Sequence, residues 1–212
     1  MLFKQLAVGP LQTNCYILGC RETNEAIIVD PGGDFDLIEK AISKLNLKPV
    51  VVVNTHAHID HIGAVEECKS HYGIKFGLCE KDLPVLKTAP DAAAMFGLGD
   101  IAVPEVDFYL KDGDTVKAGG ISFKVINTPG HTKGSVCFFG ENILISGDTL
   151  FSGSIGRTDL PGGSYKEIIS SVVKKLLPLG DGVKVYPGHG DSSTIGEEKL
   201  NNPYLNEARE NL

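Results

Sequence analysis

The sequence predicts a mixed α/β protein in which two sheets have helices on their outer sides. Strand-like runs alternate with helical patterns along the 212-residue chain. Adjacent strand-like runs, typical of hairpins, occur near residue 1 and again near residue 120. Hairpins combined with alternating strands and helices favour two mixed sheets covered by helices, although periodicity does not give the strand order.

The first part of the chain is predicted to contain three strands and a helix. Residues 2–8 and 14–20 are short strand-like runs joined by a Gly-Pro turn, and a third run over 25–30 ends at an aspartate. In the segment 34–48 apolar residues recur at helical spacing, and Asp34 is a candidate N-cap.

The middle of the chain continues this alternation. Residues 49–54, "PVVVVN", are apolar throughout, as expected for a strand covered on both faces. A helix of about two turns over 63–73 and a strand over 74–79 follow. The segment 84–104 mixes Pro, Ala and Gly, and we expect a short helix and a surface loop there.

The last part is predicted to contain four strands and one long helix. The segment 162–180 opens with Ser164 and Glu167 in the capping-box pattern, and its apolar residues lie on one helical face. The polar tail is also expected to be helical. Strands are predicted at residues 121–127, 135–140, 142–148 and 182–190.

Composition and charge exclude several classes of protein. The formal net charge is −7 and Lys and Arg do not cluster, so nucleic-acid binding, which needs clustered positive charge, is not expected. No apolar run approaches the about 18 residues of a membrane span, and the first residues do not form a secretory signal. The five cysteines are odd in number and lack Cys-x-x-Cys spacing, which favours free buried thiols in a reducing cytoplasm.

Histidines and aspartates gather where strand-like runs end. The densest group follows "VVVV" in "THAHIDH", and single candidates follow three later strands beside glycines. A rigid sheet can direct several such loops toward one point. His71 lies inside a helical pattern and is assigned to packing or to the surface. The candidate ligands are His56, His58, Asp60, His61, His131, Asp148 and His189.

This set of side chains predicts a metal site. Burying many imidazoles and carboxylates together is costly, and a divalent ion pairs with both kinds of group. Imidazole with carboxylate suits Zn, Fe, Mn, Ni or Co, whereas a structural zinc site built from cysteines is excluded because the set contains no thiolate. Seven ligands exceed what one tetrahedral ion needs, so the sequence predicts two metal ions.

The order of the motifs resembles that of the metallo-β-lactamase superfamily: "THAHIDH", "PGH", "SGDT" and "PGHG" follow one another along most of the chain. The resemblance implies an α/β (α+β) fold of the four-layer αββα sandwich type, formed by a single domain over residues 1–212. It also implies where the ligands bind. One metal would be held by His56, His58 and His131, the other by Asp60, His61 and His189, with Asp148 bridging both and Asp30 orienting a ligand imidazole.

The loop "FSGSIGRTDLPGGS" after Asp148 narrows the resemblance. It is similar to that of short bacterial glyoxalase II-like enzymes (hydroxyacylglutathione hydrolases) and of persulfide dioxygenases, and it does not resemble that of true β-lactamases. Full-length glyoxalase II adds a helical C-terminal domain, which we do not expect here, and has a tyrosine where this chain has Asp191. These departures leave open whether glutathione is the carrier of the substrate.

The implied function is hydrolysis of a small-molecule thioester or ester, with a 2-hydroxyacylglutathione thioester as the first candidate. Two divalent metal ions would lower the pKa of a shared water toward about 7, and the resulting hydroxide, oriented by Asp60, would attack the carbonyl. Zinc is the favoured metal, with iron or manganese as alternatives. A mononuclear iron persulfide dioxygenase, which would use His56, His131 and Asp148, is the main rival, and a lactonase is another.

Arg157 is the candidate for substrate binding. It lies in a glycine-rich loop after Asp148, so we expect it to be exposed and close to the metals. Glyoxalase II proteins have a lysine in a similar "GCGK" loop that contacts the glycine carboxylate of glutathione, and a guanidinium can bind a carboxylate through two hydrogen bonds. The alternative is a surface arginine paired with Asp159. The sequence does not predict the oligomeric state.

Overall fold

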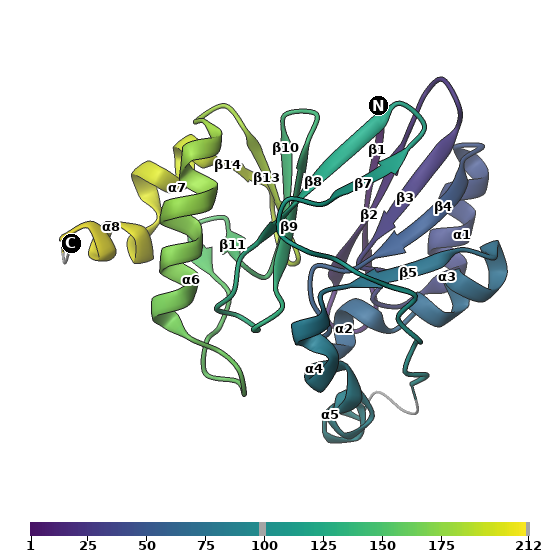
Figure 1. The fold of residues 1–212 in the computed structure, drawn as a ribbon, viewed down its shortest axis with the longest axis horizontal. Coiled ribbons are helices and arrows are strands. Elements are labelled where there is room, and N and C mark those ends of the chain that lie inside the picture. The colour runs from purple at the N-terminus through teal and green to yellow at the C-terminus, as the bar shows by residue number, and fades with distance from the viewer. Residues whose placement is uncertain (98–100, 211–212) are drawn as a thin grey trace.

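Two six-stranded sheets face each other in the computed structural model, which describes residues 1–97 and 101–210 (Figure 1). In the first sheet, the first three strands are antiparallel neighbours and the last four run parallel, so helical crossovers connect the latter. In spatial order these strands are β1 (Leu2–Val8), β2 (Thr13–Gly19), β3 (Glu25–Val29), β4 (Lys48–Val53), β5 (Lys75–Leu78) and β6 (Phe108–Tyr109).

The second sheet is built from the C-terminal half of the chain. Four consecutive strands form an antiparallel meander, and a later strand joins it in parallel. In spatial order the strands are β14 (Ser193–Thr194), β13 (Lys184–Pro187), β10 (Ile143–Gly147), β9 (Val136–Gly140), β8 (Ile121–Asn127) and β7 (Thr115–Ala118). A separate hairpin consists of β11 (Leu150–Phe151) and β12 (Ser154–Ile155).

Helices lie on the outer sides of both sheets, so the predicted four-layer αββα sandwich is confirmed (Figure 1). On the side of the first sheet lie α1 (Phe35–Lys44), α2 (Ile59–Ile62), α3 (Val65–Tyr72), the turn η1 (Glu80–Asp82), α4 (Leu83–Lys87) and α5 (Ala89–Phe96). On the side of the second sheet lie α6 (Tyr165–Ser171), the turns η2 (Val172–Leu176) and η3 (Leu177–Leu179), α7 (Ile195–Asn201) and α8 (Pro203–Glu210).

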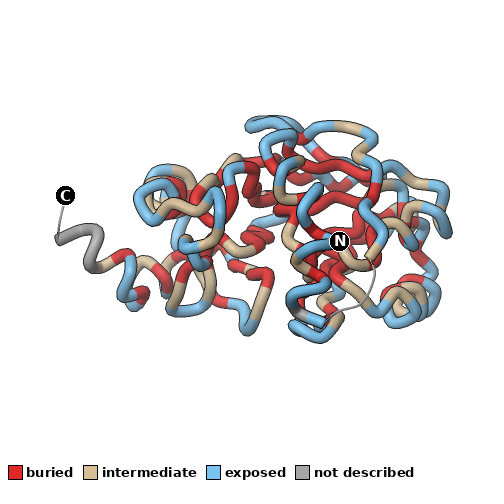
Figure 2. The backbone as a smooth tube through the Cα atoms, turned by 90° about the horizontal axis from the view of Figure 1, so that it is seen from below, coloured by how far each residue is buried: buried red, intermediate tan, exposed pale blue. Residues whose placement is uncertain are grey.

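Three apolar clusters fill the spaces between these layers, and Figure 2 shows the buried segments running through the middle of the molecule. The central cluster joins the two sheets, with Tyr16 from the first and Phe138 from the second. In the two outer clusters the helices pack against the sheets, with Ile38 from α1 and Ile168 from α6. Each such fully buried side chain contributes roughly 1.5–3 kcal/mol, so the sheets form a rigid support for the loops at their ends.

The helix predicted over 34–48 is shorter than expected. Asp34 takes the N-cap position with a φ of 49°, but its side chain makes no cap hydrogen bond. Its Oδ2 instead accepts a hydrogen bond of 2.8 Å from the backbone N–H of Gly9. The helix ends at Lys44, and Asn46 then adopts a left-handed φ of 51° that turns the chain toward β4.

The strand predicted over 49–54 is covered on both faces only toward its end. Val52 and Val53 are fully buried, whereas Val50 is 38% exposed. The well-packed part of β4 is therefore the part that leads into "THAHIDH".

The long helix predicted over 162–180 is an α-helix only for its first half. Ser164 Oγ accepts a hydrogen bond from the backbone N–H of Glu167, but the N–H of Ser164 donates to Gly130 O, so only half of the capping box forms. The chain continues as the π-helical η2 and the 3-10 turn η3. Pro178, in η3, has no N–H with which to continue an α-helix.

The segment 84–104 also differs from the prediction, because it contains most of α4 and all of α5 rather than one short helix. Residues 98–100 of that segment lie outside the described residues. The short edge strands β6, β7 and β14 and the hairpin β11–β12 were not predicted, since two to four residues give no usable periodicity.

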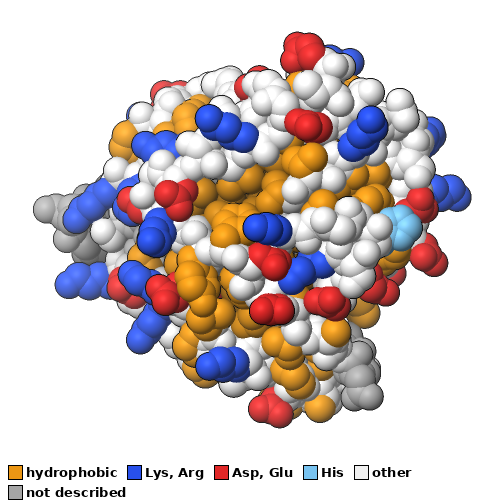
Figure 3. Space-filling view, turned by 45° about the vertical axis from the view of Figure 1, so that its right-hand side comes forward, with side chains coloured by type: hydrophobic (Ala, Val, Ile, Leu, Met, Phe, Trp, Pro, Cys, Tyr) orange, Lys and Arg blue, Asp and Glu red, His pale blue; other side chains and the backbone are white. Residues whose placement is uncertain are grey.

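The surface and the thiols agree with the expectations from composition. All five cysteines are free and buried. No helix in the described ranges has both the length and the apolar character needed to cross a membrane. On the face drawn in Figure 3, apolar side chains gather in the middle, and basic and acidic side chains are interspersed around them.

Candidate metal centre

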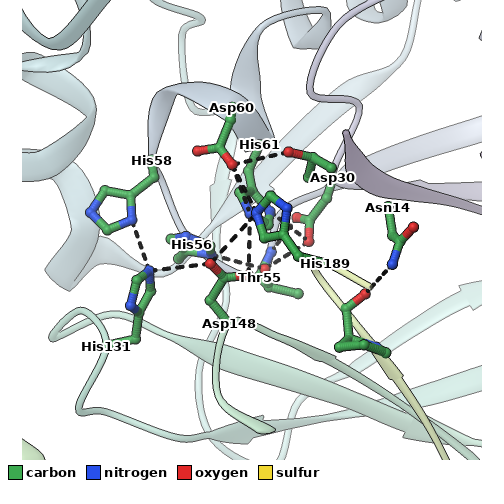
Figure 4. A network of polar contacts seen from close by, with 12 residues as sticks. Asn14, Asp30, Thr55, His56, His58, Asp60, His61, His131, Asp148 and His189 are labelled. Carbon is green, nitrogen blue, oxygen red and sulfur yellow. Dashed lines mark hydrogen bonds and ion pairs between the residues drawn. The ribbon is translucent and has the colours of Figure 1, made fainter. Parts of the chain in front are cut away.

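The predicted ligands come together at one end of the two sheets, where four strands end (Figure 4). The strands are β4 in the first sheet and β8, β10 and β13 in the second. Helix α2 begins soon after β4, which places several ligands within one short segment. The side chains that point toward one another are His56, His58, Asp60, His61, His131, Asp148 and His189.

His56, His58 and His131 form a cluster that we call the three-histidine group. One nitrogen from each lies within 4.8 Å of the others. His58 Nδ1 and His131 Nε2 are only 2.9 Å apart. Two segments that are far apart in the sequence therefore present imidazoles to a single point.

Asp60, His61 and His189 form a second cluster, the mixed group, whose ligand atoms also lie within 4.8 Å of one another. His189 Nε2 lies 3.0 Å from Asp60 Oδ2. Asp148 lies between the two groups, because its carboxylate oxygens are 3.4 Å from His61 Nε2 and 3.6 Å from His131 Nε2. A single carboxylate thus contacts both clusters.

The second ring nitrogen of three imidazoles also has a partner. Asp30 Oδ2 is 3.1 Å from His61 Nδ1, which is an ion-pair contact without hydrogen-bond geometry. His56 Nδ1 lies 3.1 Å from the hydroxyl of Thr55, and His131 Nδ1 lies 2.8 Å from the backbone oxygen of Arg157. Such contacts fix ring orientation and tautomer, and they leave Nε2 of each ring directed at the site.

Burial and neighbouring charges shift the pKa values of these side chains in different directions. Burial, reinforced by neighbouring imidazoles, holds the pKa of His56 well below its usual value and lowers the pKa of His58 to about 4. Burial would also lower the pKa of His61 and of His189, but nearby carboxylates raise both. Burial alone would raise the pKa of Asp148, but His61 and other histidines lower it.

The donor set fits divalent cations. The buried Nε2 of His56 has no hydrogen-bond partner among the described residues, and a buried polar atom left without one is costly. His58 Nδ1 and His131 Nε2 bring two further ring nitrogens to the same place. A cation there would use these lone pairs, and the carboxylates of Asp60 and Asp148 would offset its charge.

Contacts from the N-terminal hairpin support the mixed group. Thr13 Oγ1 donates a hydrogen bond of 3.0 Å to Asp60 Oδ2. Asn14 Nδ2 donates to the backbone oxygens of Pro187 and Gly190, which flank His189. Sequence reasoning missed both residues, because a hairpin start carries no signal of the distant loop that it contacts.

Asp82 was also missed, although its position offered a signal. It follows β5 in the turn η1, so it lies just after a strand end like the predicted ligands. It is fully buried and accepts hydrogen bonds from two of the ligand-bearing segments.

The side chain of Arg157 takes the alternative arrangement. It is 58% exposed, and Nε and Nη2 donate hydrogen bonds of 2.8 and 2.7 Å to the carboxylate of Asp159. Its backbone oxygen nevertheless touches His131, so the loop does lie beside the candidate centre. His71, as expected, is exposed and packs its ring against Phe35 and Tyr72.

A cavity of about 430 Å³ adjoins the mixed group at Asp60. Apolar side chains of the β1–β2 turn and of α2 line it, including Leu11 and Ile59. Glu66 and Glu67 of α3 also line it. There is therefore room beside Asp60 for part of a small molecule.

Similarity to known proteins extends over nearly the whole chain. The family model described as "Metallo-beta-lactamase superfamily" matches residues 8–189. The chain is 40% identical over 210 residues to the hydroxyacylglutathione hydrolase GloC of Haemophilus influenzae, covering 95% of this chain and 96% of that protein. Two solved structures are also similar. The B3 metallo-beta-lactamase BLEG-1 is 38% identical with a TM-score of 0.90, and the match covers 96% of this chain and 99% of that one. TTHA1623 in a di-iron-bound form is 36% identical with a TM-score of 0.86, and the match covers 95% of this chain and 100% of that one.

The similarity to BLEG-1 bears on the expectation that this chain does not resemble true β-lactamases. A protein that carries that name shares the fold and 38% of the aligned residues. Overall similarity therefore extends to a protein that carries the β-lactamase name.

Proposed function

The chain belongs to the metallo-beta-lactamase superfamily and is a metal-dependent hydrolase, and we propose that its reaction is thioester hydrolysis of the glyoxalase II type. The observation that carries this proposal is the 40% identity to hydroxyacylglutathione hydrolase GloC over nearly the full length of both proteins. The substrate class would then be a glutathione thioester of a 2-hydroxy acid, and the enzyme would act in the cytoplasm.

The arrangement of the site supports a binuclear centre. We assign one divalent metal ion to the three-histidine group and one to the mixed group, with Asp148 shared between them. Zinc suits both donor sets, and iron is an alternative because similar TTHA1623 has been solved in a di-iron-bound form. Two such cations would supply a hydroxide nucleophile at neutral pH and stabilise an oxyanion.

The chain's own residues would orient the reactants. Asp60 is ionised, because His61 and His189 lower its pKa against the effect of burial, and Thr13 fixes its Oδ2. An ionised carboxylate held in this way can accept a proton or a hydrogen bond from the nucleophile. A thiolate leaving group needs little protonation, so the site requires no separate strong acid.

The experiment that tests the proposal is metal analysis of the purified protein, paired with rates on S-lactoylglutathione. We expect about two metal ions per chain and hydrolysis of the thioester. One tightly bound iron per chain, with oxygen uptake on glutathione persulfide, would replace the proposal with the dioxygenase alternative. A lactone and a chromogenic cephalosporin belong in the same panel, because faster turnover of either would reassign the substrate class.

A further inference from the structure

Asp82 is a buried carboxylate that contacts none of the candidate ligands directly. Its Oδ2 accepts hydrogen bonds from the backbone N–H of Ala57 at 2.9 Å and from Thr132 Oγ1 at 3.0 Å, and its Oδ1 accepts one from the N–H of Gly134 at 2.8 Å. The residue is fully buried, and burial raises the pKa of its carboxyl against the effect of these hydrogen bonds.

The three donors belong to two segments that both carry ligands. Ala57 lies between His56 and His58, and Thr132 directly follows His131. The first segment leaves the first sheet and the second leaves the second sheet. The two oxygens of Asp82 therefore connect the loops of both sheets at the point where the three imidazoles meet.

Asp82 is one connection between these two loops, and the hydrogen bond of 2.8 Å from Val136 N–H to Thr55 O is another. His58 Nδ1 and His131 Nε2 are held 2.9 Å apart, although β-sheets on opposite sides of the sandwich supply them. Loops without a shared anchor would separate or fluctuate, and small displacements of a ligand weaken metal binding.

Gly134 shows that the second loop approaches Asp82 as closely as it can. A Cβ atom at this position would lie 2.6 Å from Asp82 Oδ1 and 2.7 Å from its backbone nitrogen. Any larger residue would push the His131 loop away from η1. The loop is fixed further by Ser135 Oγ, which accepts a hydrogen bond of 3.0 Å from the N–H of Thr132.

We propose that Asp82 is a positioning residue that sets the spacing of the three-histidine group for metal binding. Asp30 has the corresponding place beside the mixed group, where it accepts from Thr55 and contacts His61. The two carboxylates differ in that Asp30 touches a ligand ring, whereas Asp82 acts only through the backbone and Thr132. This inference rests on the proposed metal centre, not on the identity of the substrate.

The test is the affinity of each metal group in Asp82→Asn, measured by competition with a chromophoric chelator. The amide keeps the shape of the side chain, but its NH2 would face a backbone N–H in either orientation, so one connection is lost. We expect the three-histidine group to bind zinc about 10–100-fold more weakly and the mixed group to be unchanged.

Matched variants identify which group is affected. His58→Ala and His61→Ala provide reference cobalt(II) absorption spectra for the loss of each group, and Asp82→Asn should reproduce the former. Asp107→Asn is the control at the other end of β5, because Asp107 accepts a backbone hydrogen bond from Phe76 of that strand rather than from a ligand-bearing segment. It should bind both metals normally.

Two milder variants keep the test decisive if Asp82→Asn does not fold. Thr132→Val removes one of the three donors, and Gly134→Ala displaces the second loop. Both should weaken the three-histidine group, while Thr132→Ser should restore its affinity. Equal weakening of both groups, or a lower melting temperature of the metal-free protein with normal metal affinity, would show that Asp82 only supports the fold. These outcomes do not depend on whether a thioester is hydrolysed, so the proposed reaction can fail independently.

Discussion

The three-histidine group and the mixed group are neighbours, yet their electrostatic surroundings are opposite. In the first, burial and adjacent imidazoles lower the pKa of His56 and His58. In the second, carboxylates raise the pKa of His61 and His189 against the effect of burial. Burial thus favours the neutral form of His56 and His58, whereas carboxylates bring negative charge to the mixed group.

Because of this difference, we expect different interactions to hold a cation in the two groups. The three-histidine group depends on the spacing of its rings, which segments from two sheets supply. The mixed group depends on charge, from Asp60 within it and from Asp30 behind His61. Asp148 couples the two, since it contacts His61 and His131.

Removing the shared carboxylate should weaken metal binding in both groups. Asp148→Ala removes a carboxylate that contacts ligands of both groups, so we expect the metal content to fall below about one ion per chain and kcat/KM to fall at least about 1000-fold. Metal analysis and steady-state kinetics measure both. If two ions and normal turnover persist, Asp148 does not bridge.

Neutralising the mixed group alone should impair chemistry more than binding. Asp60→Asn keeps the size of the side chain but removes its charge, and we expect kcat to fall about 100-fold with a smaller change in KM. Kinetics on metal-replete protein test this. Thr13→Ser, which keeps the hydroxyl that donates to Asp60, is the matched control and should remain near wild type. An effect confined to KM would contradict the assigned role.

Changing Asp30, the carboxylate beside His61 Nδ1, should affect the metal affinities of the two groups differently. Asparagine tolerates the φ of 52° at Asp30, so Asp30→Asn should preserve the backbone while weakening the contact with His61 Nδ1. We expect the mixed group to lose about 10–100-fold in metal affinity and the three-histidine group to lose less. Chelator competition distinguishes the two, and an equal loss in both would mean that Asp30 acts through Thr55 instead.

The smallest effect is expected outside both groups, at Arg157. If its guanidinium exchanges Asp159 for a substrate carboxylate, Arg157→Ala should raise KM about tenfold with kcat little changed, whereas a neutral ester should be unaffected. Arg157→Lys keeps the charge and should lie between the two. An equal loss on both substrates would indicate that the side chain holds its loop through Asp159 rather than binding the ligand.

The sequence predicted the location of the candidate site better than it predicted the contacts that hold the ligand loops in place. Strand-end histidines and aspartates are visible as a pattern because sheets bring strand ends together, and all seven candidates do converge. The packing of segments that are far apart in the chain leaves no such pattern in the sequence. The contacts of Asn14 with Pro187 and of Arg157 O with His131 depend on how two loops pack, which local periodicity does not contain.

Deviations from regular elements were missed for a related reason. Asp34 has a good N-cap side chain, yet it bonds to Gly9 of a neighbouring turn instead of its own helix. Ser164 makes only half of its capping box because Gly130, beside His131, accepts its N–H. In both cases a tertiary contact replaces the local one that the sequence suggests.

The loop that carries His189 is held by hydrogen bonds from residues near the N-terminus. Asn14 and Tyr16 donate hydrogen bonds to Pro187 O across separations of 173 and 171 residues. His189 is also the last of the seven candidate ligands along the chain. The mixed group is therefore complete only when the two ends of the chain have met.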